Sequence, residues 1–246
     1  MRIIYYIYQL IIALPIILIA TLLTALITSF GCSLFGSNFW GYYPGKIWSI
    51  IVCKVLLLPI HIEGKENIEK QIPYVFVANH QGAMDIFLLY GFIGKNFKWM
   101  MKNEIRKIPF VGYACYKAGF IFVNNKEKNT NLLETMEHCS SILSKGISMI
   151  VFPEGTRTAD GKMRKFNKGA FFLADELQIP VIPITINGSF QVLPKTKGVG
   201  FVHRHPLTMT IHKPIIPTSK GRENIIELSR QSFDIINASL PLELKR

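Results

Sequence analysis

The first 60 residues are far more apolar than the rest of the chain. Residues 3–31 form an uncharged run, and residues 1–60 hold three basic residues and no acidic one. About 20 consecutive apolar residues suffice to cross a bilayer as a helix. A cleavable secretory signal has a shorter apolar core, of roughly 7–15 residues. The pattern therefore predicts an N-terminal membrane anchor that is retained.

A second apolar stretch runs from Ile47 to Ile60 and carries Lys54 in its middle. Aromatic residues surround its start, and such side chains favour the membrane–water interface. Two arrangements of residues 1–60 fit this pattern. One is a spanning helix followed by an interfacial helix, and the other is a helical hairpin that dips into one leaflet. Either would hold a domain that begins near residue 61 against the lipid surface.

From residue 61 onward, short β-branched and apolar runs alternate with helical patterns. The runs that predict strands are Tyr74–Ala78, Phe120–Val123, Ser148–Phe152, Val181–Ile186 and Leu207–Ile211. The patterns that predict helices are Met84–Phe92, Thr130–Leu143, Gly169–Leu177 and Glu223–Leu240. We therefore predict an α/β domain over residues 61–246, with a mixed sheet covered by helices.

Charge and cysteine usage narrow the class of partner. The chain carries a formal net charge of +12, and residues 61–246 account for +9 of it. A basic domain joined to an apolar segment favours membrane headgroups or phosphorylated substrates. The sequence has no helix-turn-helix, zinc-finger or RNA-binding aromatic signature, so we expect no nucleic-acid partner. The four cysteines form no C-x-x-C pair, so we expect neither a disulfide framework nor a metal site.

The first candidate for chemistry is the segment N-H-Q-G-A-M-D at residues 79–85, which follows a predicted strand and opens a predicted helix. On a straight helix, His80 and Asp85 would point about 140° apart. They can meet if His80 lies on the turn before the helix, which Gly82 would permit. Asp85 would then fix the imidazole tautomer and leave the other ring nitrogen as a general base. Taken alone the spacing is weak, because a core histidine and a helix-capping aspartate give the same pattern.

The second candidate is V-F-P-E-G-T-R at residues 151–157, directly after another predicted strand. Gly155 and Thr156 could offer backbone N–H groups to an anion, which the Arg157 guanidinium could grip. In isolation, an ordinary surface turn with a solvated arginine would be the better interpretation.

Together the two segments resemble the glycerolipid acyltransferases, in particular the 1-acyl-sn-glycerol-3-phosphate acyltransferases. N-H-x-x-x-x-D is followed by F-P-E-G-T-R at the family's spacing, and three further segments are similar to family motifs. These are Lys102-Asn103-Glu104 with Pro109 and Gly112, Gly119–Val123, and Val181–Ile184. The resemblance covers residues 61–215 in the right order.

This resemblance implies a direct acyl transfer without a covalent acyl-enzyme. His80 would take the proton from the free hydroxyl of lysophosphatidate, and Asp85 would orient His80. The alkoxide would attack the thioester of acyl-CoA or acyl-carrier protein. The substrate-binding positions implied are Lys102, Lys126, Glu154, Gly155, Thr156 and Arg157. No metal ion or cofactor is implied, and we expect the domain on the cytoplasmic face of the plasma (inner) membrane.

One departure from the family pattern puts the acceptor in question. The family's second motif usually closes with Asp-Arg, whereas this chain has Asn124-Asn125 followed by Lys126. Lys126 could supply the missing charge, or the acceptor could be another lysophospholipid or a lyso-aminolipid. Two further alternatives are a thioesterase, in which His80 activates water, and a catalytically inactive membrane-binding protein.

Overall fold

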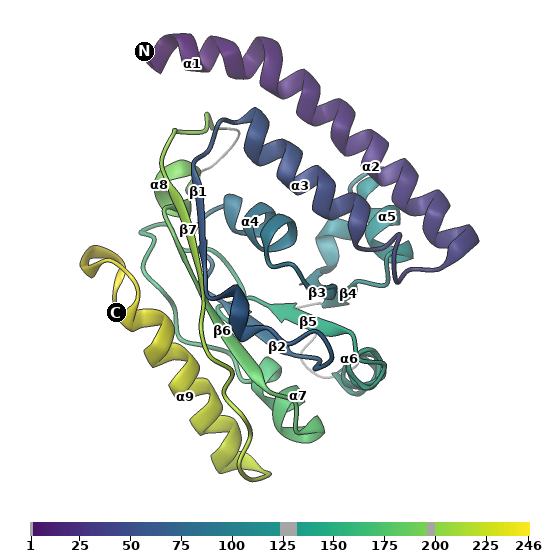
Figure 1. Cartoon of the computed structure of the whole chain (residues 1–246), viewed down its shortest axis with the longest axis vertical. Helices are drawn as coiled ribbons and strands as arrows, with labels where there is room; N and C mark the ends of the chain where they lie inside the picture. Colours follow the sequence, from purple (N-terminus) through teal and green to yellow (C-terminus); the bar gives the residue numbers. More distant parts are fainter. Residues whose placement is uncertain (1, 124–131, 196–199) are drawn as a thin grey trace.

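A computed structural model describes residues 2–123, 132–195 and 200–246. Within these residues a seven-stranded sheet lies between two layers of helices (Figure 1). The strands are β1 (Ile60–Glu63), β2 (Val75–Ala78), β3 (Phe97–Lys102), β4 (Ile121–Val123), β5 (Ser148–Val151), β6 (Val181–Asn187) and β7 (Leu207–Ile211). The α-helices are α1 (Arg2–Tyr8), α2 (Leu14–Phe35), α3 (Tyr43–Val55), α4 (Met84–Phe92), α5 (Val111–Lys117), α6 (Leu132–Ser144), α7 (Gly169–Leu177), α8 (Ser189–Val192) and α9 (Arg222–Ala238). The short helical turns are η1 (Gln9–Ala13), η2 (Lys65–Asn67), η3 (Asn103–Lys107) and η4 (Leu242–Leu244).

The sheet order is β1-β7-β6-β2-β5-β3-β4, and every neighbouring pair is parallel except β6 with β7. The predicted mixed sheet is therefore confirmed. Strands β2 and β5 lie in its centre and are buried along their whole length, as expected for parallel strands covered on both faces. The carboxyl ends of β2, β5, β3 and β4 meet at one edge of the sheet.

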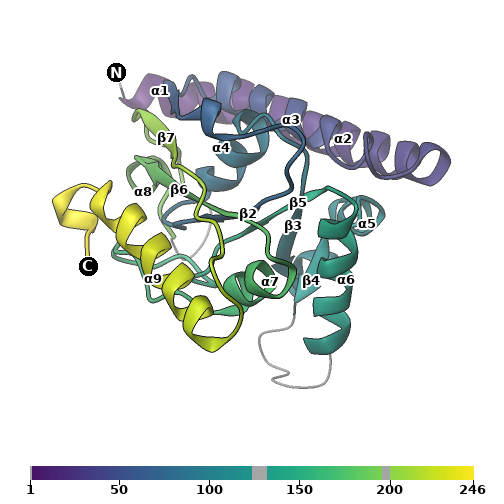
Figure 2. The ribbon, with the colours of Figure 1, turned by 60° about the horizontal axis from the view of Figure 1, so that its bottom comes forward.

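The alternation of side chains along β2 divides the interior into two cores. Phe76 and Ala78 belong to the core beneath α3 and α4. Val75 and Val77 belong to the core beneath α6, α7 and α9. Figure 2 shows the same two layers, with α3 and α4 on one side of the sheet and α7 and α9 on the other.

Several predicted elements have the bounds that the pattern indicated. α4 and α7 match the predictions to the residue, and α9 begins one residue before the predicted start. The apolar stretch from Ile47 to Ile60 is not one element, because α3 ends at Val55 and Ile60 already begins β1.

Strand β3 was not predicted, because Lys98 interrupts its apolar run. In the structure Lys98 is buried, and its Nζ donates hydrogen bonds to the backbone oxygens of Ser37 (2.8 Å) and Ala118 (2.6 Å). Burial lowers the pKa of the Lys98 ammonium to about 8. Both acceptors lie just beyond a helix C-terminus, where carbonyl groups favour a cation. The lysine therefore joins the end of α2 to the end of α5.

The N-terminal helices α1, η1 and α2 form one continuous helix, Arg2–Phe35, with a mean hydropathy of 2.9 in its most apolar window. By length and composition this helix could cross a membrane. It lies along the α/β domain and beside α3 (Figure 1).

Both ends of this helix are fastened to the domain. Near its start, the Gln9 side-chain amide makes two hydrogen bonds with the main chain of Val202, at 2.8 and 2.9 Å. Near its end, Gly31 packs so tightly on the Trp40 ring that an added Cβ would lie 2.4 Å from it. Beyond this contact, α2 also packs on α5.

Residues from both sides of position 60 share one core. Val52 and Cys53 of α3 are buried in the same cluster as Phe76 and Leu88 of the α/β domain. The division into an anchor (1–60) and an acyltransferase domain (61–246) stays a prediction, but α3 packs as part of the domain.

Candidate active site

Sheet topology brings the two candidate segments together. Strands β2 and β5 are parallel neighbours in register, with Val77 opposite Val151. Adjacent strands lie roughly 4.8 Å apart. The segments that leave their carboxyl ends, residues 79–85 and 152–157, therefore meet at the same edge of the sheet, although some 70 residues of chain separate them.

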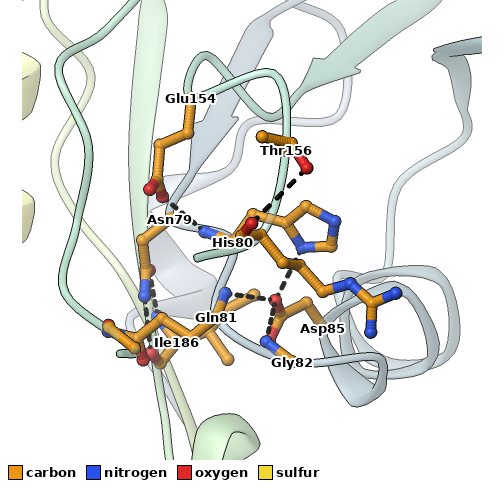
Figure 3. A network of polar contacts seen from close by, with 10 residues as sticks. Asn79, His80, Gln81, Gly82, Asp85, Glu154, Thr156 and Ile186 are labelled. Carbon is orange, nitrogen blue, oxygen red and sulfur yellow. Dashed lines mark hydrogen bonds and ion pairs between the residues drawn. The ribbon is translucent and has the colours of Figure 1, made fainter. Parts of the chain in front are cut away.

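His80 and Asp85 are in direct contact (Figure 3). The His80 Nδ1 atom lies 2.8 Å from Asp85 Oδ2. His80 lies in the turn before α4 and Asp85 in the first turn of that helix, so the predicted meeting of the two side chains is confirmed. The His80 side chain is 14% exposed, whereas Asp85 is fully buried. Their catalytic roles stay predictions.

Asp85 is fixed by three donors on one oxygen. Oδ2 accepts the backbone N–H groups of Gln81 (2.8 Å) and Gly82 (3.0 Å) in addition to the imidazole. Because an ionised carboxylate only accepts hydrogen bonds, its partner atom His80 Nδ1 carries the proton. His80 Nε2 is then left with a lone pair, which is the state that a general base needs.

Gly82 is required for a different reason from the one expected. It is absent from the positive-φ positions, so the turn does not depend on glycine's conformational freedom. Instead, a Cβ at this position would lie 2.2 Å from the backbone oxygen of Ser189. The next residue, Ala83, donates its N–H to the backbone oxygen of Leu193. Gly82 therefore allows the catalytic turn to pack closely on the segment around α8.

Phe152 stacks on the face of the His80 ring, a contact that the sequence did not reveal. The two ring centroids are 3.9 Å apart and the planes differ by 12°. Phe152 in turn stacks on Trp99 of β3, with centroids 5.8 Å apart. Aromatic stacking fixes the plane of the imidazole, and an aromatic face stabilises a cation placed over it. The only signal in the sequence is that Phe152 opens the F-P-E-G-T-R segment.

Glu154 connects two loops through its carboxylate. Oε1 accepts the backbone N–H of His80 and Oε2 accepts that of Arg164, both at 2.7 Å. Burial raises the pKa of Glu154 from its ordinary value of 4.5 to about 7, although both N–H donors oppose this shift. The predicted substrate-binding residue is thus held in a structural position behind His80 (Figure 3).

The turn at Gly155 differs from the expected anion site. The Gly155 N–H donates to the backbone oxygen of Phe152 at 3.0 Å, so the prediction that it is free to bind an anion is wrong. Gly155 instead supplies the left-handed backbone that closes the turn, with φ +74°. Thr156 lies beside His80 (Figure 3), and its Oγ1 is 3.4 Å from Lys195 Nζ.

Arg157 is half-buried next to this turn. Within the described part of the chain, its guanidinium makes no hydrogen bond or ion pair, which leaves its charge for a ligand. Lys102 is the exposed last residue of β3, at the same edge of the sheet. The third predicted cation, Lys126, lies outside the described residues, as do Asn124 and Asn125.

Two polar residues beside His80 were not identified from the sequence. Asn79 is buried, and its side-chain amide exchanges hydrogen bonds of 2.8 and 2.7 Å with the main chain of Ile186. Gln81 donates from Nε2 to the backbone oxygen of Gly161 at 2.9 Å. Their positions on either side of His80 in the N-H-Q segment could have identified them.

The basic loop over residues 157–168 is held in place. Met163 and Phe166 are buried in the core of the second helical layer. Asn167 donates both its backbone N–H and its side-chain amide to the backbone oxygen of Pro153. The loop is therefore a fixed wall of the site.

Comparison with known proteins identifies the family. The sequence model of the Acyltransferase family matches residues 59–187, more than half of the chain. The protein belongs to this family. Across the described ranges, no cluster of three or more His, Cys, Asp or Glu side chains could hold a metal ion. The expectation that no metal or cofactor takes part stays a prediction.

Among similar curated proteins is a chloroplastic 1-acyl-sn-glycerol-3-phosphate acyltransferase of Arabidopsis thaliana, 35% identical over 175 residues, which are 71% of this chain and 48% of that protein. A Saccharomyces cerevisiae 1-acyl-sn-glycerol-3-phosphate acyltransferase is 29% identical over 212 residues, 85% of this chain and 69% of that protein. The chain spans about half the length of the first curated relatives that it matches.

A similar solved structure is the 1-acyl-sn-glycerophosphate acyltransferase PlsC of Thermotoga maritima. It has a TM-score of 0.63 and 28% sequence identity, and the match covers 89% of this chain and 94% of that one. The predicted acyltransferase-like fold, with its N-terminal apolar helix, is thereby confirmed.

The raised pKa of Glu154 predicts a pH-dependent stability. Between pH 4.5 and about 7 the folded protein keeps a proton that the unfolded chain releases, so the contribution of Glu154 to stability is lost as pH rises through this window. Relative to Glu154→Gln, which cannot titrate at this position, the native protein should lose roughly 3 kcal/mol of its free energy of unfolding across this pH window. Melting temperatures of both proteins at pH 4.5, 6 and 8 measure this loss.

Glu66→Gln, at an exposed carboxylate, is the matched control and should follow the native profile. If the profiles of the native protein and Glu154→Gln run parallel, Glu154 does not hold its proton in the folded state.

Proposed function

We propose that the protein transfers an acyl chain to the free sn-2 hydroxyl of 1-acyl-sn-glycerol-3-phosphate, giving phosphatidate for phospholipid synthesis. The donor is an acyl thioester, either acyl-CoA or acyl-carrier protein. The observation that carries the proposal is the His80–Asp85 pair at the open edge of the sheet, beside the F-P-E-G-T-R turn. The names of the relatives and of the solved PlsC structure support it.

The geometry suits general-base catalysis. His80 Nε2 takes the proton of the acceptor hydroxyl while the hydroxyl oxygen forms a bond to the thioester carbonyl carbon. The carbon–sulfur bond then breaks, and the leaving thiolate receives the proton from the imidazolium. Asp85 stays ionised throughout and stabilises the imidazolium, as does the face of Phe152. No group of the protein becomes acylated.

The acceptor phosphate is the part of the substrate that basic side chains recognise. Arg157 is half-buried beside Thr156, and its guanidinium presents a planar fork to phosphate oxygens. Lys102 adds charge at the same edge of the sheet. We place Thr156 and Arg157 at the phosphate and give Glu154 and Gly155 the task of shaping this turn.

A second candidate keeps the reaction and changes the acceptor. Asn124-Asn125 stands where the family usually has Asp-Arg, which favours another lysophospholipid or a lyso-aminolipid. Lys126 is the residue that would restore a cation for a bare phosphate. A panel of acceptors separates the two candidates.

We propose that the N-terminal helix holds the protein at a membrane and lies within one leaflet; its length and apolar composition support this. A helix of 34 residues is roughly 51 Å long. If it crossed the ~30 Å hydrocarbon core, its two ends would lie on opposite sides. Gln9 is bonded to Val202, and the other end of the helix is joined to the same folded domain by α5 and Lys98, so we favour a hairpin of Arg2–Phe35 with α3. Because both donors are cytosolic, we propose that the domain lies on the cytoplasmic face of the plasma (inner) membrane.

Removal of the base should abolish transfer. Detergent-solubilised protein is incubated with acyl-CoA or acyl-carrier protein and a panel of lysolipids, and His80→Ala is compared with the native protein. Loss of general-base catalysis should lower kcat roughly 10²–10⁴-fold. Preferred turnover of lysophosphatidate supports the main proposal, and preference for another lysolipid supports the second. Release of free fatty acid without an acceptor would instead indicate a thioesterase, and no turnover by the native protein an inactive fold.

Removal of the Arg157 charge should act on acceptor binding. Arg157→Ala is expected to raise the KM for lysophosphatidate by about tenfold or more, because a charge-assisted hydrogen bond to phosphate contributes roughly 1.5–3 kcal/mol. The KM for the acyl donor should change little. Lys220→Ala, at an exposed surface ion pair with Glu176, is the control. An unchanged acceptor KM would show that the phosphate binds elsewhere.

Loss of the aromatic face should act on the chemical step. Phe152→Leu is expected to lower kcat about 3- to 30-fold, since cation–π contacts contribute roughly 0.5–2 kcal/mol. Both KM values should stay near the native ones. Phe171→Leu removes a fully buried aromatic ring of α7 and serves as the stability control. A native kcat in Phe152→Leu would show that the stack does not assist the imidazolium.

A further inference from the structure

The segment between β3 and β4 exposes an unusual amount of apolar surface. Ile108, Phe110, Tyr113 and Tyr116 are 48%, 60%, 54% and 52% exposed, and we call these four side chains the α5 patch. Single exposed apolar residues are normal on protein surfaces, but four within nine residues concentrate apolar surface in one segment, as interaction sites do.

Cations accompany the α5 patch. The Arg106 guanidinium lies 4.9 Å from the centroid of the Tyr116 ring, and Lys117 Nζ lies 5.5 Å from that of Tyr113. Lys107 adds a further charge, and none of the three forms an ion pair within the described ranges. Aromatic rings beside unpaired lysine and arginine are typical of surfaces that meet anionic headgroups.

The backbone holds the patch in a fixed and strained shape. Phe110 has φ +60° and ψ −50°, which is costly for a residue with a Cβ. The turn around it is closed by the Gly112 N–H, which donates to the backbone oxygen of Ile108 at 2.8 Å. Gly112 lies so close to Arg106 that an added Cβ would be 2.2 Å from its backbone oxygen. Backbone strain of this kind is maintained by the surrounding structure and clusters at sites that contact a ligand.

The neighbouring surface indicates what covers it. Helix α5 packs on α2 (Figures 1 and 2), and the last turns of α2 expose Phe30, Leu34 and Phe35 at 68%, 59% and 70%. The α5 patch is therefore carried by a segment that packs against the apolar N-terminal helix. A lipid bilayer fits both these neighbouring apolar side chains and the positive charge.

We propose that the α5 patch inserts into an anionic bilayer as a second membrane contact beside the N-terminal helix. This inference rests on the proposed membrane placement and deepens it. The turn η3 leaves β3 at Lys102, on the sheet edge that carries His80. Insertion here brings the bilayer next to the active site, so that a lysolipid acceptor can enter from the membrane without crossing water.

The test places a tryptophan in the patch. Full-length Phe110→Trp is mixed with vesicles of equal parts phosphatidylcholine and phosphatidylglycerol, with or without bromine on the acyl chains, which quenches tryptophan on contact. The control is Ile216→Trp, at a residue that is 67% exposed and lies in the segment between β7 and α9. Helix α9 covers the face of the sheet opposite to α3 (Figure 2). The native Trp40, Trp48 and Trp99 contribute equally to both variants.

We expect the fluorescence added at position 110 to be quenched by at least half and that added at position 216 to be unaffected. If the native tryptophans are quenched and position 110 is not, the α5 patch does not insert, while the membrane placement stands. If brominated vesicles quench no tryptophan in any variant, both the insertion and the membrane placement are wrong.

A second measurement is made on activity. Phe110→Ser/Tyr113→Ser should raise the apparent KM for lysophosphatidate in vesicles several-fold, with kcat/KM unchanged for a short-chain acceptor dissolved as monomers. Ile216→Ser should change neither value. An equal loss with both forms of acceptor would mean that the substitutions act on the fold or on the chemistry, and would overturn the proposed role in lipid access.

Discussion

The site depends on one buried oxygen atom, Oδ2 of Asp85. A carboxylate removed from water is tolerated only when donors compensate for its lost hydration. Here two backbone N–H groups and the His80 imidazole all point at Oδ2, and all three belong to the five residues before Asp85. The charge thus shapes the turn and orients the base in the same step. An apolar residue at position 85 would leave both the turn and the imidazole without their hydrogen-bond acceptor.

The neighbours of His80 connect this turn to the rest of the domain by hydrogen bonds. Asn79 bonds the turn to β6, and Gln81 bonds it to the basic loop. Glu154 accepts the backbone N–H groups of both His80 and Arg164. These bonds run to β6 on one side and to the basic loop on the other, so the turn is held from two directions. A base held in this way needs little reorganisation when substrate binds, which favours catalysis.

Sequence patterns predicted the parts of this arrangement that depend on local order. The contact of His80 with Asp85 and the bounds of α4 follow from residues close together in the chain, and the helix-covered sheet follows from the alternation of strands with helices. Strand β3 was missed because the burial of Lys98 depends on Ser37 and Ala118, which lie far away in sequence. Ring orientation was equally hidden, since no spacing reveals that Phe152 lies face to face with His80. The close approach of Gly82 to Ser189 also depends on tertiary packing, which the sequence pattern does not reveal.

The bonds between Gln9 and Val202 have a consequence for the order of events during synthesis. They join residues that are 193 positions apart, so they cannot form until the chain as far as Val202 has left the ribosome. The apolar helix emerges first and stays without its docking surface during most of translation. If this helix enters lipid as proposed, it can do so before its docking surface exists, and the domain would then complete its folding next to a helix that is already in the membrane.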